Sequence, residues 1–193
     1  QRQMCIRDRN RVKELPAFIP ELITGSVSSF ISGYEITRVG DPIYSYYGYE
    51  VEGIFQKDDN IASSAQPNAK PGELKFKNQD SDNAITSNDR VVLGKPFPDV
   101  TFGFTNSLRY KNFSLSIFVQ GVLGIQTLDA NVIETLYPTN EYRNRIAKYY
   151  TGRWTENNPT NKYPSGVNPS NYGGQYSINS LTVVDLSLIH ISE

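Results

Sequence analysis

The chain of 193 residues contains one cysteine, one methionine and one histidine. A single cysteine cannot close an intrachain disulfide, so a disulfide-stapled scaffold is excluded. A single histidine argues against a Cys/His zinc centre and against a catalytic unit built on histidine. No apolar run approaches the roughly 18 residues that a membrane-spanning helix needs. The 19 basic and 20 acidic side chains nearly balance, which excludes a polybasic nucleic-acid binder and an acidic disordered tail.

The three rare residues all lie at the ends of the chain. Met4 and Cys5 belong to residues 1–9, and His190 belongs to residues 186–193. Both segments resemble conceptual translations of sequencing-adapter DNA, and segments of that kind are set aside in reasoning about a fold. The alternative is that they are ordinary termini. On the adapter interpretation, the native stretch is residues 10–185, an internal fragment of a longer gene product.

The clearest local pattern is a hairpin. Two stretches of alternating apolar and polar residues flank Lys111-Asn112, and the parity of the alternation changes across that pair. A two-residue turn pairs Tyr110 with Phe113 and brings the apolar residues of both strands to one face. Lys-Asn is not the best pair for such a turn, although Asn at the second position tolerates a positive φ. The predicted apolar face consists of Val100, Phe102, Phe104, Leu108, Tyr110, Phe113, Leu115, Ile117 and Val119.

Two architectures accommodate this hairpin. Each strand has about 9 to 11 residues, the length that crosses a bilayer in an outer-membrane barrel, and the small polar residues of the other face suit a water-filled lumen. A soluble β-sandwich also has strands that are apolar on one face. The periodicity alone leaves both alternatives open.

The rest of the chain has weaker patterns. Residues 26–55 are rich in Tyr, Val, Ile and Ser, which favours strands, whereas residues 57–73 are typical of an exposed loop. Residues 131–176 form a long excursion, in which Asn140 could cap one short helix over residues 141–150.

Eight short motifs follow one another along the chain. They are VGDPI at 39–43, YGYEVEGIFQ at 47–56, PGELKF at 71–76, ITSNDR at 85–90, GKPFP at 94–98 with FGF at 102–104, YKNFSLS at 110–116, QGVLG at 120–124 and RWT at 153–155. In this order they resemble the C-terminal part of the SusC/RagA family of TonB-linked outer-membrane receptors of Bacteroidetes. The resemblance covers nearly all of residues 10–185.

The resemblance implies an all-β fold: a partial transmembrane antiparallel β-barrel, open as a curved sheet in this fragment, with long extracellular loops and one short helix. It implies import of glycan or peptide fragments across the cell outer membrane. It also implies contact with outer-membrane lipid, a SusD-like surface lipoprotein as partner, and coupling to TonB through a plug that is not in this segment. The alternative function is that of a secreted β-sandwich carbohydrate-binding module.

One acidic stretch matches the spacing of a calcium loop. Asn78, Asp80, Asp82 and Asp89 occupy positions 1, 3, 5 and 12 of an EF-hand-like loop, whose oxygen ligands could hold Ca²⁺. Asn78 stands in place of the usual first Asp, and Asn83 stands where glycine makes the sharp turn. The alternative is a solvated acidic turn.

Aromatic residues in the long excursion are candidate ligand contacts, because an aromatic face can stack on a sugar ring. The candidates are Tyr137, Tyr142, Tyr149, Tyr150 and Trp154. Packing within the loop or an interfacial aromatic belt is the alternative role for the same residues.

No catalytic residue is predicted. The adjacent carboxylates Asp58 and Asp59 lie in an open loop, without sign of a buried pair with separated pKa values. Gly94-Lys95 lacks the upstream glycine of a phosphate-binding loop and is followed by Pro96. The sequence therefore predicts no enzyme, and no cofactor other than the possible calcium ion.

Overall fold

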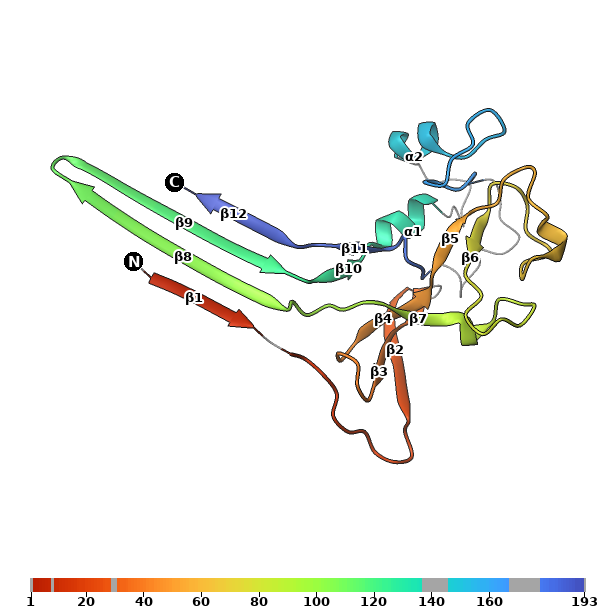
Figure 1. The fold of residues 1–193 in the computed structure, drawn as a ribbon, viewed down its shortest axis with the longest axis horizontal. Coiled ribbons are helices and arrows are strands. Elements are labelled where there is room, and N and C mark those ends of the chain that lie inside the picture. Colours follow the sequence, from red (N-terminus) through yellow and green to blue (C-terminus); the bar gives the residue numbers. More distant parts are fainter. Residues whose placement is uncertain (1, 8, 29–30, 137–145, 167–177, 193) are drawn as a thin grey trace.

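A computed structural model describes residues 2–7, 9–28, 31–136, 146–166 and 178–192. Figure 1 shows a long sheet, which we call the arm, extending away from a packed part, which we call the head. The arm comprises β1 (Arg2–Arg7), β8 (Val100–Tyr110), β9 (Phe113–Leu123) and β12 (Leu188–Ser192), hydrogen-bonded in the order β1-β8-β9-β12. The head comprises the described residues of 10–95 and 125–186.

The predicted hairpin is the centre of the arm. β8 and β9 pair antiparallel along their full length, with Tyr110 opposite Phe113 and Phe104 opposite Val119, so the predicted register is confirmed. The turn differs in one detail, because the positive φ, 52°, falls on Lys111 and not on Asn112. The first turn residue therefore adopts the left-handed conformation, although asparagine at the second position tolerates it better.

The apolar face of the arm is left uncovered. Tyr110 is 71% exposed, Phe113 81% and Leu108 58%. A β-sandwich buries such a face against a second sheet, whereas a barrel wall presents it to lipid. The open arm therefore has the form of a partial barrel wall and lacks the closed core of the sandwich alternative.

The two end segments of the chain form the edge strands of the arm. β1 pairs with β8 and β12 pairs with β9, both antiparallel. A bare strand edge presents unpaired N–H and C=O groups to which an extended segment can bond whatever its origin. These pairings are compatible with either interpretation of residues 1–9 and 186–193, so the adapter interpretation stays a prediction.

Most of the chain builds the head. Its largest sheet has the order β2-β3-β4-β7, with β2 (Glu21–Ser28), β3 (Ile31–Arg38), β4 (Ser45–Tyr49) and β7 (Arg90–Gly94). Two smaller sheets pair β5 (Val51–Ile54) with β6 (Leu74–Phe76) and β10 (Gln126–Leu128) with β11 (Val183–Asp185). The short helical segments are α1 (Ala130–Leu136), α2 (Ala147–Gly152) and the 3-10 turns η1 (Ile61–Ser63) and η2 (Ser87–Asp89).

The helices differ from the single one expected over 141–150. α2 covers only the end of that range and begins after Ile146, which gives no side-chain cap; Asn140 lies outside the described residues. α1 was not predicted, although Asp129 marks its start by accepting the backbone N–H groups of Asn131 and Val132 at 3.0 and 3.3 Å. Among the described residues, no helix is long and apolar enough to cross a membrane.

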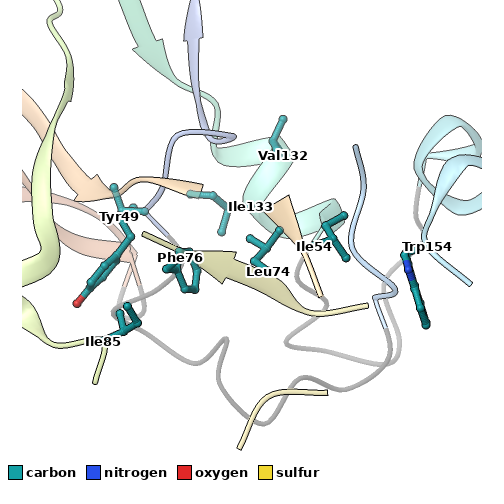
Figure 2. Packing of buried hydrophobic residues seen from close by; sticks show 9 residues of the cluster. Tyr49, Ile54, Leu74, Phe76, Ile85, Val132, Ile133 and Trp154 are labelled. Atoms are coloured by element: carbon teal, nitrogen blue, oxygen red, sulfur yellow. The ribbon is translucent and has the colours of Figure 1, made fainter. Parts of the chain in front are cut away.

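The head has its own hydrophobic core. Figure 2 shows this cluster, with Tyr49 at one end and Trp154 at the other. The buried members come from β4, β5, β6, α1 and several connecting segments, and they are Tyr49, Ile54, Leu74, Phe76, Ile85, Val132, Ile133, Trp154 and Ile178. The loop predicted at residues 57–73 is exposed along most of its length but ends in the buried pair Gly72 and Glu73.

Two segments that lie far apart in the sequence are joined by backbone hydrogen bonds beside this core. Tyr49 donates its backbone N–H to the carbonyl of Ile178 at 2.9 Å and accepts from the N–H of Ser180 at 3.0 Å. A Cβ added to Gly48 would lie 2.3 Å from the Ile178 carbonyl oxygen, so this approach requires glycine. Residues 45–54 and 178–182 therefore pack as one unit, although the whole hairpin separates them in sequence.

Candidate functional site

The predicted calcium loop is organised around a buried carboxylate. Asp89 is fully buried, and its Oδ1 and Oδ2 accept the backbone N–H groups of Gln79 at 2.6 Å and Thr86 at 2.7 Å. The Thr86 hydroxyl accepts the N–H of Asn88 at 3.2 Å, which completes a capping box at η2. Both oxygens of Asp89 are thus engaged in ordering the loop.

The other candidate ligands also bond within the loop. Asp80 accepts the N–H of Asp82 at 3.2 Å, and Asp82 accepts that of Ala84 at 2.8 Å. Asn78 accepts from Ser81 at 2.7 Å and donates to the Asp82 carbonyl. Within the described ranges, no three acidic, histidine or cysteine side chains converge as a metal site would require. The geometry fits an Asx-turn loop better than a calcium cradle.

Asp89→Ala is expected to reduce the free energy of unfolding by about 2 to 4 kcal/mol, because two partly buried backbone N–H groups lose a charged acceptor. Urea unfolding followed by the fluorescence of Trp154, the only tryptophan, measures this. Asp80→Ala is the control and should change little, since Asp80 is exposed. A calcium site would instead stabilise the unmodified chain in millimolar calcium and lose that effect in both variants.

The three described aromatic candidates have different surroundings. Trp154 is 7% exposed within the core, and its indole Nε1–H donates to Oε1 of Gln56 at 2.8 Å, which matches the loop-packing alternative. Tyr149 packs edge-on against Tyr163, with 4.7 Å between ring centroids. Tyr150 is 59% exposed, with the Arg153 guanidinium 4.0 Å from its ring centroid. Tyr137 and Tyr142 lie outside the described residues.

Charged side chains in the head mainly form hydrogen bonds and ion pairs near the surface. Glu50 accepts from the Gln79 side-chain amide at 2.9 Å and from the Lys77 ammonium at 3.1 Å. These hydrogen bonds, the one from Gln79 foremost, lower the pKa of the Glu50 carboxyl. Asp59, one of the adjacent carboxylates, accepts the N–H of Gln56 at 2.8 Å and so closes a turn. This arrangement orders the loops around β5 and β6.

Sequence reasoning missed the residues that pack around Trp154 and along the edge of β5. Gly72 has a φ of +88°, and an added Cβ would lie 2.5 Å from the indole and 2.7 Å from Cβ of Ser165. Asn161 accepts the backbone N–H of Ile54 at 3.1 Å and so continues the edge of β5 with a side chain. The only local signal was the Pro-Gly pair at 71–72, which indicates a turn but not what packs on it.

Comparison with known proteins agrees with the form of the arm. TonB-dependent receptor P3 of Formosa agariphila is 34% identical over 131 residues, which cover 66% of this chain and 13% of that receptor. TonB-dependent receptor SusC of Bacteroides thetaiotaomicron is 32% identical over 88 residues, 42% of this chain and 9% of that receptor. The structure of the RagAB peptide transporter superposes with a TM-score of 0.65 at 17% identity, covering 93% of this chain and 18% of the transporter chain. In sequence the chain is similar to a segment of the TonB-dependent receptors, SusC among them.

This SusC/RagA-like chain spans about 13% of the length of the first two curated relatives that it matches. No family model matches it. The matched proteins bear the names of receptors and a transporter, not of enzymes. At 17% identity, the likeness to the RagAB transporter concerns the fold alone.

Proposed function

We propose that this chain supplies part of the barrel wall and of the extracellular surface of an outer-membrane TonB-dependent importer. The observation that carries the proposal is the open arm, whose paired strands of 11 residues each present an exposed apolar face. Eleven residues extend about 36 Å, and a tilt of about 45° reduces this to about 25 Å along the bilayer normal. That height equals the apolar band of outer-membrane barrels.

The lengths of the connections between strands indicate which end of the arm faces the cell exterior. In such barrels the periplasmic turns are short and the extracellular connections are long. The two-residue turn at Lys111 and Asn112 is therefore assigned to the periplasm, and the head, into which both long connections fold, is assigned to the cell exterior. The more polar face of the arm, with Ser107 opposite Ser116 but also Phe118 opposite Thr105, then lines the lumen.

The head is the part of this chain that would meet ligand and partner. We infer that the imported ligand is a glycan or peptide fragment, that a SusD-like or RagB-like lipoprotein closes the mouth above the head, and that TonB acts through a plug elsewhere in the receptor. Among the described aromatic candidates, Tyr150 is the one open to such a ligand, because it is exposed while Trp154 is buried. Calcium binding is not required by this function.

Cysteine labelling of intact cells tests the orientation. In the full receptor that carries this segment, Asp58→Cys should react with a membrane-impermeant maleimide on intact cells. Asn112→Cys should react only after the outer membrane is permeabilised. Both positions are exposed in the folded chain, so burial does not limit either reaction. Labelling of position 112 on intact cells, with position 58 protected, would reverse the assignment; equal labelling of both would contradict a spanning arm.

A further inference from the structure

A cavity lies where the arm meets the head, beside the paired inner ends of β1 and β8 (Figure 1). Its volume is about 850 Å³, within the range of small-molecule sites in proteins. Its wall comes from the end of β1 and the segment that follows, from Pro42, and from the segment that leads into β8. We call it the junction cavity. Its charged lining residues are Arg7, Arg9, Arg11, Lys95 and Asp99, so cations predominate.

The acidic groups at this cavity are already paired with other cations. Asp99 accepts from the Lys95 ammonium, with 2.5 Å between Oδ1 and Nζ. Asp41, the neighbour of the lining residue Pro42, pairs with Arg38. Neither carboxylate therefore neutralises the arginines of the cavity. The arginine side chains to which the described part of the chain supplies no hydrogen bond or ion pair are Arg7, Arg9 and Arg11.

The backbone around Arg11 is held in place by the head. Val12 donates its backbone N–H to the carbonyl of Asp41 at 2.9 Å and accepts the N–H of Gly40 at 3.0 Å. The Arg11 side chain itself is exposed. The part of the wall that follows residue 9 is present on either interpretation of residues 1–9. The cations on which a site can rest are therefore Arg11 and Lys95.

The junction cavity lies at the end of the apolar band of the arm. Val100, which lines the cavity, is the first residue of β8 and belongs to the apolar face. In the proposed orientation this end of the arm meets the cell exterior, so the cavity is level with the headgroups of the outer leaflet. Lipid phosphates are the anions concentrated at a membrane surface. The planar guanidinium of arginine matches a phosphate group, and lysine adds a point charge.

We propose that the junction cavity binds a phosphate group of an outer-leaflet lipid headgroup. Arg11 is the principal ligand, because its guanidinium is exposed and unpaired within the described residues; Lys95, already paired with Asp99, is the second. This inference rests on the proposed function, since only a spanning arm with its head outside brings the cavity to the outer leaflet. A bound headgroup would hold the base of the head at the membrane surface.

Lipid binding by the full 193-residue chain tests this site. Native mass spectrometry in neutral detergent micelles, titrated with diphosphorylated lipid A, should show a single retained lipid. Arg11→Gln with Lys95→Gln should weaken that binding by at least about tenfold, because charged hydrogen bonds to phosphate are lost. Arg109→Gln with Lys111→Gln is the matched control, since it removes the same two residue types from exposed positions at the other end of the arm. Its affinity should stay within about twofold of the unmodified chain.

Three outcomes would contradict the site, and urea unfolding followed by Trp154 fluorescence first establishes that each variant folds. Displacement of lipid A by millimolar inorganic phosphate would show a site for the free ion and overturn the lipid assignment. Equal weakening by both double variants would show attraction to charge in general and overturn the site, while leaving the labelling of positions 58 and 112 as proposed. Weakening by the 109–111 variant alone would reverse the orientation of the arm and overturn both this inference and the proposed function.

Discussion

Gly72→Ala is expected to reduce the free energy of unfolding of the head by about 2 to 5 kcal/mol. The residue has a φ of +88°, which disfavours any side chain by about 1 to 2 kcal/mol. The new methyl group would also lie 2.5 Å from Cε3 of Trp154, and overpacking of this kind typically costs about 1 to 3 kcal/mol. The backbone cannot move away easily, because Gly72 donates to the Phe55 carbonyl at 2.7 Å and accepts from the N–H of Ser165 at 2.8 Å.

Gly40→Ala separates the cost of a positive φ from the cost of the close contact with the indole. Gly40 has a φ of +96°, but an added Cβ would have no neighbour within 4 Å. Gly40→Ala should therefore reduce the free energy of unfolding only by the cost of the positive φ, about 1 to 2 kcal/mol. Urea unfolding followed by Trp154 fluorescence measures both variants. Equal losses for the two would show that the indole does not pack on Gly72 in solution.

Val119→Arg is expected to impair insertion of the arm into a bilayer by about 2 to 4 kcal/mol. Val119 lies opposite Phe104 on the apolar face, near the middle of β9, and a lipid-facing arginine at mid-depth in a barrel costs about that much. The neighbouring residue Gln120 lies on the polar face opposite Gly103. Gln120→Arg should therefore insert almost as well as the unmodified chain.

The free energy of insertion of the two arginine variants is measured by reversible insertion into lipid vesicles, titrated with urea. The comparison controls for the charge and size of the introduced residue and for chain position, since arginine is introduced at two adjacent positions on opposite faces. A similar loss for both variants would contradict the assignment of the faces. A loss confined to Gln120→Arg would reverse it.

The arm could be predicted from sequence because its determinants are local. A period of two residues, whose parity changes at Lys111-Asn112, defines both strands and their register. Its exceptions are Asn106 on the apolar face and Phe118 and Val122 on the other face. The conformation of the turn was not predicted: Lys111 takes the positive φ, although intrinsic preferences favour asparagine in that conformation. Pairing along two strands of 11 residues outweighs such a preference at one position.

The head could not be predicted in the same way, because its core joins residues far apart in sequence. Nothing local to Trp154 indicates that Gln56 accepts from its indole or that Gly72 lies against its ring. Polar side chains also take the place of strand partners, as where Ser180 accepts the backbone N–H of Val51 at 3.0 Å. Such contacts leave no periodic signal. Residues 57–73 were therefore expected to be a loop and residues 131–176 a long excursion with one short helix, whereas strands were expected only over residues 26–55 of the head.

The candidate calcium loop likewise combines a local sequence pattern with contacts that the pattern does not reveal. The spacing of Asn78, Asp80, Asp82 and Asp89 predicts either a calcium loop or a solvated acidic turn, because spacing does not distinguish ligands for a cation from acceptors for backbone N–H groups. The direction of Asp89, inward onto Gln79 and Thr86, comes from the fold and not from the motif.

Depth measurement on the arm tests the central claim most directly. Spin labels placed singly at Leu115 and Ser116, adjacent residues on opposite faces of β9, would be compared in the full receptor in lipid vesicles. The account predicts that the label at 115 is broadened by oxygen dissolved in the lipid and shielded from a water-soluble relaxation agent, and that the label at 116 shows the reverse. Equal access of the aqueous agent to both labels would contradict a barrel wall whose apolar face meets the membrane.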